Sequence, residues 1–288
     1  LSLFLKTIYK SGMNILITGG AGYVGCELSK SLLDEGHNIT SLDLYLYGED
    51  VMPNHKNLNV VKGDIRNSNL LKKIFENQDV VIHLACISND PSFELNPDLG
   101  KSINLDAFEP MVKIAKDMGV KRFIYASSSS VYGIKNEQNV HEEMSLEPLT
   151  DYSKFKAMCE DTLLKYKSSD FEVVVIRPAT VCGYSKRQRL DVVVNILTNL
   201  AYNKGEITVL GGEQLRPNIH IKDMIQAYKT TISSDSSLVN GQIFNAGYEN
   251  IKVNEIANLV KKNIGDNVKI IKKKNQMTID HIIYQARK

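Results

Sequence analysis

The stretch ILITGGAGYVGCELSKSLLDEGHNITSLD, residues 15–43, decides the fold of this chain. Its pattern predicts a short apolar strand, a turn, an amphipathic helix and a second strand. The turn carries Gly19, Gly20, Gly22 and Gly25, although glycine is costly in regular structure because it loses the most backbone freedom on folding. So many glycines indicate that the backbone must approach something closely at this turn.

A glycine-rich turn between a strand and a helix is a typical binding place for a diphosphate, which sits on the exposed N–H groups at the start of the helix. The spacing is G-x-G-x-x-G from Gly20 and G-x-x-G-x-x-G from Gly19, and the glycines alone do not choose between these. Tight packing is an alternative use for them. Asp43 favours the diphosphate, because it ends the second strand about 20 residues after Gly22, where a carboxylate can bind a ribose 2′-OH.

Asp43 also indicates which dinucleotide binds. A carboxylate at this place repels a 2′-phosphate, and no arginine follows in LYLYGED, residues 44–50, so NAD is favoured over NADP. The segment GDIRN then places Asp64 at the end of the third strand, within reach of the adenine. A plain turn role for Asp64 is an equally good interpretation.

Up to about residue 180, strand-like and helix-like segments alternate. The apolar runs include NITSLD, DVVIHLA, KRFIYAS and FEVVVIR, and helix-length stretches separate most of them. Because parallel strands need such crossovers, the pattern predicts an α/β fold, a Rossmann-type doubly wound parallel sheet whose NAD-binding domain spans residues 13–180. Gly36 and Gly119 stand where left-handed helix ends are expected.

Residues 181–288 have a different rhythm: one helix, a short strand, a polar loop to Pro217, and then further helices and a strand. We expect a smaller mixed α/β lobe that binds substrate. No Pro- or Gly-rich linker precedes it, so we expect a close interface with a cleft between the two regions. We interpret residues 1–12 as a leader or a misassigned start before Met13.

Composition excludes several classes of function. The formal charge is +2 over 288 residues, from 35 basic and 33 acidic side chains, which argues against nucleic-acid and membrane partners. Four cysteines lie far apart and no histidine spacing resembles a ligand set, so we expect no metal. With no cysteine-dense framework and no long apolar span, we expect a cytoplasmic protein.

A second cluster indicates the chemistry. YASSSSVYG ends a strand, and DYSKFKAMCE follows about twenty residues later. Tyr152 and Lys156 are four residues apart at the start of a helix, so both point the same way. A lysine ammonium beside a phenol favours the phenolate, which can act as a general base, and a serine hydroxyl at the strand end can bind the same substrate oxygen.

Together these residues make the chain resemble the extended short-chain dehydrogenase/reductase family, in particular its NAD-dependent epimerase/dehydratase group acting on nucleotide sugars. The resemblance covers roughly residues 13–262 and rests on TGGAGYVG, GDIR, HLAC, SSSSVYG, YSKFK, RPATVCG and RPNIHIKD. It implies that Gly19, Gly22 and Gly25 are the phosphate-loop glycines, with Ser128, Tyr152 and Lys156 as the catalytic residues.

The resemblance also implies the ligand contacts. The remaining cofactor-binding residues would be Tyr23, Val24, Asp43, Asp64, Ile65, Leu84, Ala85, Cys86, Pro178 and Val181, and Tyr152 and Lys156 would contact the cofactor too. The substrate would contact Ser128, Thr180 and Arg216, the last as the arginine that holds a nucleotide diphosphate. His220 and Asp223 are better read as bracing the loop and capping its helix.

Departures from the family restrict the reaction. The related 4,6-dehydratases carry Thr-Asp-Glu where this chain has Ser128, Ser129 and Ser130, so elimination lacks its carboxylates. Many epimerases carry asparagine at Thr180. NQMTIDHIIYQARK does not resemble the family's closing segment, so we expect residues 181–288 to be truncated or divergent at their end.

We therefore predict an NAD-dependent nucleotide-sugar epimerase acting at C4 through a transient 4-keto intermediate. A nucleotide-sugar 4-ketoreductase is the alternative, and a dehydratase or a non-catalytic dinucleotide-binding protein carries less weight. The resemblance further implies a homodimer through the helices near residues 99–118 and 152–166. Their apolar residues Ala107, Met111, Ala157 and Leu163 fit that contact, although burial against the sheet explains them equally well.

Overall fold

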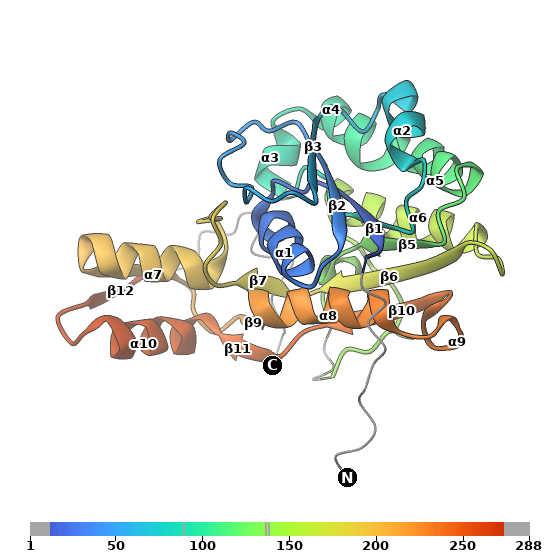
Figure 1. Ribbon diagram of the computed structural model, residues 1–288. Coiled ribbons are helices and arrows are strands. Elements are labelled where there is room, and N and C mark those ends of the chain that lie inside the picture. Colours follow the sequence, from blue (N-terminus) through green and yellow to red (C-terminus); the bar gives the residue numbers. More distant parts are fainter. Residues whose placement is uncertain (1–11, 89, 136, 138, 274–288) are drawn as a thin grey trace, which may run out of the picture.

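The computed structural model describes residues 12–88, 90–135, 137 and 139–273 (Figure 1). Within them a seven-stranded sheet forms the centre, and every pairing in it is parallel. In spatial order its strands are β10 (Gln242–Ala246), β6 (Glu172–Pro178), β5 (Arg122–Ala126), β4 (Val80–His83), β1 (Asn14–Thr18), β2 (Asn38–Asp43) and β3 (Leu58–Lys62). Strands β4 and β5 are buried along their whole length, as expected for strands covered on both faces.

Helices cover both faces of this sheet. Those of the main body are α1 (Tyr23–Asp34), α2 (Ser68–Phe75), α3 (Asp90–Glu94), α4 (Pro97–Lys101), α5 (Phe108–Asp117), α6 (Asp151–Lys165), α8 (Ile221–Ser233) and α9 (Ser236–Val239). One core cluster joins α2, α5 and α6 to one face, and a second joins α1 and α8 to the other. The doubly wound Rossmann-type prediction is therefore confirmed.

The segment between α4 and α5 is irregular. Residues Ser102–Asp106 form a π-helix, η1, so the helical stretch expected near residues 99–118 consists of three pieces. Three residues considered for a dimer contact, Ala107, Met111 and Leu163, are at most 7% exposed and belong to the core cluster of α2, α5 and α6. Packing against the sheet within one chain accounts for them, because that face of α5 and α6 is the one turned inward.

The second lobe has two small sheets. In spatial order, one contains β11 (Glu249–Lys252), β9 (Leu215–His220) and β7 (Thr180–Cys182), and the other contains β12 (Lys269–Lys273) and β8 (Glu206–Leu210). Helices α7 (Val193–Lys204) and α10 (Val253–Ile264) pack on each other and share a third core cluster with β8. A mixed α/β lobe is present, but it is smaller than the expected residues 181–288, because α8, α9 and β10 pack with the seven-stranded sheet instead.

The expected polar loop to Pro217 is wrong, because residues 215–220 form strand β9. Pro217 lies opposite Asn250 of β11, whereas the pairing with β7 begins only at Asn218. Pro217 therefore has no partner on β7. A strand tolerates proline where its backbone nitrogen is not needed for pairing.

The order of the strands fixes where ligands bind. Strand β1 lies between β2 and β4, so the chain reverses its direction of travel across the sheet at β1. In open parallel sheets a crevice forms at this reversal, outside the carboxyl ends of the strands. Gly19, Asp43 and Leu84 each stand at or just beyond such an end. In the described part of the chain, no helix is both long and apolar enough to cross a membrane.

Candidate active site and cofactor crevice

The glycine turn is packed so closely that side chains cannot replace its hydrogens. Gly19 has a φ of +74°, and a Cβ on it would lie 2.7 Å from the backbone nitrogen of Ala85. A Cβ on Gly25 would lie 2.2 Å from the carbonyl oxygen of Gly19. Gly20 is equally restricted, because its Cβ would come within 2.2 Å of the Ser41 hydroxyl. The three glycines hold the turn against the ends of β4 and β2 and against the start of α1.

The start of α1 fits a diphosphate. Gly22 is the N-cap, and no side chain caps the helix, so the first-turn N–H groups of Tyr23, Val24 and Gly25 point out of the helix toward the glycine turn. Backbone N–H groups at the positive end of a helix bind phosphate. Contact of these N–H groups with the diphosphate of the cofactor stays a prediction.

The Tyr23 side chain takes no part in this contact. Its hydroxyl donates to the carbonyl oxygen of Gly183 at 2.7 Å and accepts from the Asn195 amide at 3.1 Å. Burial raises the pKa of this phenol, so it stays neutral. Only the backbone of Tyr23 can therefore serve a diphosphate, while the ring fastens α1 to the second lobe.

Asp43 faces the glycine turn from the end of β2. Its carboxylate oxygens accept from the backbone nitrogens of Ala21 at 3.1 Å and Tyr45 at 2.9 Å. Two backbone hydrogen bonds fix the carboxylate beside the crevice, where the sequence places the ribose of the adenosine half.

The Asp64 carboxylate bonds a residue of its own turn. It accepts from the backbone nitrogen of Arg66 at 2.8 Å and forms an ion pair with that side chain, and the guanidinium lowers the pKa of Asp64. The side chain of Ile65 is 7% exposed and lies in the core under α2, so only its backbone can reach a ligand. The structure thus supports the turn role of Asp64, and contact of either residue with adenine stays a prediction.

The segment after β4 closes the other side of the crevice. The backbone nitrogen of Leu84 donates to the carbonyl oxygen of Thr18 at 3.0 Å, and that of Ala85 lies 3.5 Å from the Thr18 hydroxyl. Cys86 follows and is half-buried. These contacts bring the three residues expected beside the cofactor next to the glycine turn.

Tyr152 and Lys156 lie on the first turns of α6. Thr150 and Ser153 form a capping box that begins this helix. Lys156 is 4% exposed, and its ammonium donates to the carbonyl oxygen of Ala126 at 2.6 Å. The same ammonium lies 5.8 Å from the centre of the Tyr152 ring, close enough to stabilise a phenolate electrostatically.

Ser128 stands at the same strand end, two residues after Ala126. It begins the short 3₁₀ turn Ser129–Tyr132, and its oxygen accepts from the nitrogen of Ser130 at 3.1 Å and from the Ser130 hydroxyl at 2.9 Å. The oxygen therefore has a fixed position at the carboxyl end of β5. The structure brings Ser128 and Lys156 to one end of β5, with Tyr152 beside the lysine.

The end of β6 and the second lobe carry the residues expected to face nicotinamide and substrate. Pro178 ends β6, and β7 continues the chain into the lobe with the half-buried residues Thr180 and Val181. Thr180 pairs with Asn218 on β9, and Arg216 lies two residues earlier on that strand. Thr180 and Arg216 thus share one small sheet, while their contact with a substrate stays a prediction.

Comparison of the sequence with protein families shows to which family the chain belongs. The model described as "NAD dependent epimerase/dehydratase family" matches residues 15–247. The chain belongs to this family. The expected resemblance is confirmed, the chain is an enzyme, and NAD is its cofactor.

Individual members of the epimerase/dehydratase family agree over most of the chain. UDP-glucose 4-epimerase of Lactobacillus helveticus is 26% identical, covering 86% of this chain and 82% of its own length. Among solved structures, UDP-N-acetylglucosamine 4-epimerase from Methanobrevibacter ruminantium M1, in complex with UDP-N-acetylmuramic acid, has a TM-score of 0.85 and 25% identity over 92% of this chain and 86% of its own. MoeE5 in complex with UDP-glucuronic acid and NAD has a TM-score of 0.77 and 25% identity, covering 96% and 94%.

Sequence reasoning did not single out Asn104 and Arg189, two polar residues that bond the segment after β4. Asn104 lies buried in the π-helix, and its side-chain amide bonds both the nitrogen and the carbonyl oxygen of Ile87 at 2.9 Å. Arg189 donates to the carbonyl oxygen of Ser88 at 3.2 Å and pairs with Asp191. Burial alone would lower the pKa of Arg189, but Asp191 and the nearby Tyr152 raise it. An amide on an otherwise apolar helix face was the signal for Asn104, whereas no local pattern marked Arg189.

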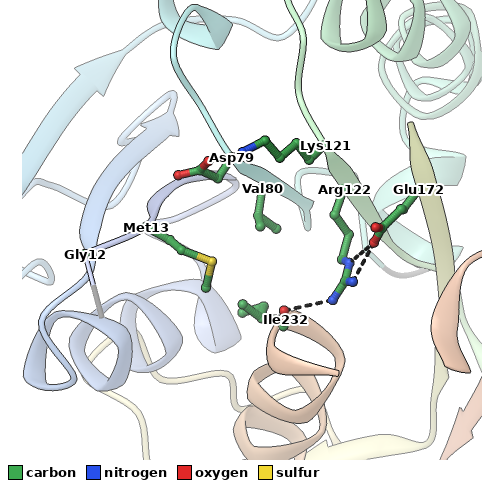
Figure 2. Close-up of a pocket in the computed structure, with 8 residues that line it drawn as sticks. All are labelled: Gly12, Met13, Asp79, Val80, Lys121, Arg122, Glu172 and Ile232. Carbon is green, nitrogen blue, oxygen red and sulfur yellow. Dashed lines mark hydrogen bonds and ion pairs between the residues drawn. The ribbon is translucent and has the colours of Figure 1, made fainter. Parts of the chain in front are cut away.

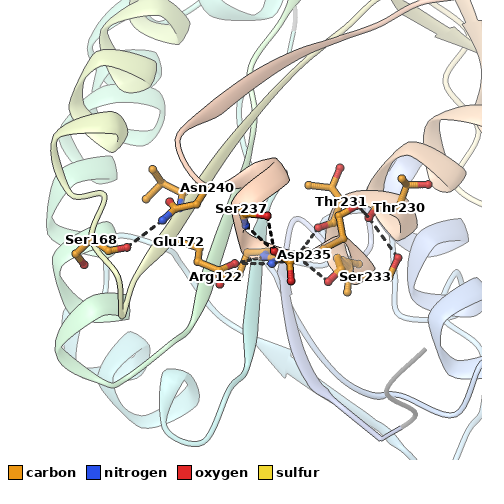
Figure 3. A network of polar contacts seen from close by, with 12 residues as sticks. Arg122, Ser168, Glu172, Thr230, Thr231, Ser233, Asp235, Ser237 and Asn240 are labelled. Atoms are coloured by element: carbon orange, nitrogen blue, oxygen red, sulfur yellow. Dashed lines mark hydrogen bonds and ion pairs between the residues drawn. The ribbon is translucent and has the colours of Figure 1, made fainter. Parts of the chain in front are cut away.

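A cavity of about 230 Å³ lies at the opposite end of the sheet (Figure 2). The starts of β4, β5 and β6 line it together with Met13 and Ile232. Its one buried cation, Arg122, pairs with Glu172 and donates to the carbonyl oxygens of Thr231 and Ile232. Figure 3 shows the wider network, which joins the end of α8 to β5 and β6. This cavity is remote from the carboxyl ends of the strands, and its charges are already paired, so we assign it a structural role.

Proposed function

We propose that this enzyme is a nucleotide-sugar epimerase that inverts C4 of the sugar through a transient 4-keto intermediate. The observation that carries the proposal is the position of Lys156, which is buried, bound to the end of β5 and 5.8 Å from the Tyr152 ring. A phenolate held at this place can accept the proton of a sugar hydroxyl, and the Ser128 hydroxyl can bind the same oxygen.

NAD, held by the glycine turn, Asp43 and the segment after β4, would supply reversible hydride transfer at C4 of the sugar. The protein has three tasks in that cycle. Tyr152 removes the hydroxyl proton and later restores it, Ser128 holds the oxygen, and Lys156 keeps the phenolate favourable. For the hydride to return to the opposite face, the keto sugar must turn over while its nucleotide stays bound. We propose that Arg216 on β9 binds that nucleotide through its diphosphate, for which a guanidinium fork is suited.

Elimination is disfavoured by the residues that follow Ser128. Ser129 and Ser130 cannot exchange protons as a carboxylate pair can, and Ser130 is buried and bonded to Ser128. The buried carboxylate of Glu160 is occupied by Arg177. The 4-epimerase names of the Lactobacillus helveticus and Methanobrevibacter ruminantium relatives support the same reaction.

The test is turnover with UDP-glucose and UDP-N-acetylglucosamine, followed by NMR of the sugar ring. We expect the C4 epimer to form with no net change in NAD. Tyr152→Phe should lower kcat by roughly 10²- to 10⁴-fold while the NAD content of the purified protein stays the same. Net oxidation of added NADH with a 4-keto sugar would instead establish a ketoreductase, and loss of water would establish a dehydratase.

We also propose that the enzyme is a cytoplasmic homodimer joined through α5 and α6. Apolar side chains that the core leaves exposed on or beside these helices support the contact: Met118 is 37% and Met158 is 49% exposed. Light scattering during gel filtration should give twice the chain mass. Met158→Glu should shift the protein to the monomer, and an unchanged mass would contradict this interface.

A further inference from the structure

A loop of the second lobe, residues 183–191, lies on the first turns of α1. The Ser185 hydroxyl donates to the carbonyl oxygen of Tyr23 at 2.7 Å, and the backbone nitrogen of Lys186 donates to the Glu27 carboxylate at 2.9 Å. The Tyr23 hydroxyl bonds the carbonyl oxygen of Gly183. The 183–191 loop is therefore fastened to the helix that presents its N–H groups to the diphosphate.

The 183–191 loop also crosses the crevice. At one side the guanidinium carbon of Arg187 lies 3.6 Å from the centre of the Tyr47 ring, in the segment that follows Asp43 and β2. At the other side Arg189 donates to the carbonyl oxygen of Ser88, in the segment that follows β4. Because β2 and β4 are the two neighbours of β1, the loop between these contacts passes in front of the glycine turn.

Arg187 carries an uncompensated charge at this place. Across the described ranges, no carboxylate lies within ion-pair distance of Arg187. Its Nη1 donates to the carbonyl oxygen of Gln188 at 2.5 Å, whereas its Nε is buried with no hydrogen-bond acceptor. A buried donor on a cation is costly to leave unpaired, and a guanidinium fork suits phosphate oxygens.

We propose that Arg187 binds the phosphates of NAD, with the Tyr47 ring as the platform that holds the guanidinium over the glycine turn. Cation–π contact with Tyr47 fixes the plane of the guanidinium while leaving the donors at its edge available. The diphosphate would then lie between the N–H groups of α1 and Arg187. The second lobe thereby closes over the cofactor as well as the substrate, whichever sugar reaction the enzyme catalyses.

Release of the cofactor is the direct test. The protein is loaded with NADH, excess NAD is added, and the loss of bound NADH fluorescence is followed. We expect Arg187→Ala to raise the NADH dissociation constant by roughly 10- to 100-fold, chiefly through faster release. Arg187→Lys keeps the charge without the fork and should fall between wild type and Arg187→Ala. Tyr47→Leu removes the platform and should weaken binding severalfold.

Lys186→Ala is the matched control, because Lys186 has the same charge and its side chain is exposed, while only its backbone bonds Glu27. It should leave NADH release unchanged. Calorimetry with ADP and adenosine identifies the group recognised: Arg187→Ala should weaken ADP binding and leave adenosine binding unchanged. Urea unfolding of each variant separates loss of a contact from loss of the fold.

Two results would overturn the proposal. One is NADH release from Arg187→Ala as slow as from Lys186→Ala. The other is weaker binding of UDP with unchanged binding of ADP and NADH, which would assign Arg187 to the substrate's phosphates. If Arg187→Ala does not fold, the same comparison is made with Arg187→Lys and Tyr47→Leu. None of these outcomes depends on turnover, so failure of the proposed C4 reaction would remain distinguishable.

Discussion

Glu160 and Arg177 form an ion pair at 2.6 Å behind the strand end that carries Ser128, and their side chains are only 2% and 3% exposed. The Ser127 hydroxyl donates to Glu160. Arg177 donates to the Tyr132 hydroxyl at 2.7 Å, which in turn donates to Asn245 at 2.7 Å. One buried network therefore joins α6, β6, the 3₁₀ turn after Ser128 and β10.

Breaking this pair should destabilise the protein strongly. Glu160→Gln leaves a buried guanidinium without its counter-charge, and we expect a loss of about 3–5 kcal/mol in the free energy of unfolding. The double variant Glu160→Leu with Arg177→Met removes both charges and should lose less. Urea unfolding at neutral pH measures both. Equal losses in single and double variants would show that packing, and not the unpaired charge, dominates.

Asp43 should set the preference for NAD over NADP. Asp43→Asn retains an oxygen that can accept from the Ala21 nitrogen, but it removes the negative charge. We expect the ratio of NADP to NAD dissociation constants to fall about tenfold, since a unit charge close to a 2′-phosphate is worth 1 kcal/mol or more. Asp50→Asn, exposed in the same segment, is the control and should leave the ratio unchanged.

Gly25 and Gly36 should respond differently to alanine. At Gly25 the new methyl group meets the Gly19 carbonyl oxygen at 2.2 Å, so the glycine turn must move, and we expect about 1–3 kcal/mol of destabilisation with loss of NAD binding. Gly36 has a φ of +85° and nothing within 4 Å of its Cβ position. Gly36→Ala should cost about 1 kcal/mol of backbone strain with NAD binding intact. Calorimetry with NAD distinguishes the two effects.

His83 should make the fold sensitive to acid. Burial, helped by the Lys156 charge, lowers its pKa to about 3. Below pH 6.5 the unfolded chain therefore binds a proton that the folded chain does not, and the free energy of unfolding falls as the pH falls, by about 1.4 kcal/mol at pH 5.5. His83→Gln should remove this part of the pH dependence. Burial also lowers the pKa of His37, but His37 is present in both wild type and His83→Gln, so its effect cancels when the two are compared. If the free energy of unfolding of the two proteins changed in parallel with pH, the assignment to His83 would be contradicted.

Local features were predictable from the sequence because short-range sterics and hydrogen bonds decide them. The turn before α1 follows from its glycines, and Gly36 and Gly119 have φ of +85° and +79° at helix ends as expected. His220 caps α8 by accepting from the Lys222 nitrogen at 3.3 Å. Each of these depends on residues within a few positions of one another.

Long-range contacts were not predictable in the same way. Arg177 forms an ion pair with Glu160, but composition and spacing do not indicate which of the 35 basic and 33 acidic residues pair with each other. Arg187 reaches Tyr47 only because the 183–191 loop is fastened to α1. The three-dimensional path of the chain, and not any local pattern, creates these contacts.

Strand β10 has a consequence for how the protein is made. It pairs with β6, whose segment EVVVIRP is buried at five consecutive positions. As the ribosome delivers the chain from its N-terminus, β6 emerges long before residues 242–246, and until then its outer edge offers unpaired backbone groups beside apolar side chains. Such an edge recruits other strands. The nascent chain is therefore prone to aggregation until β10 has been synthesised and pairs with β6.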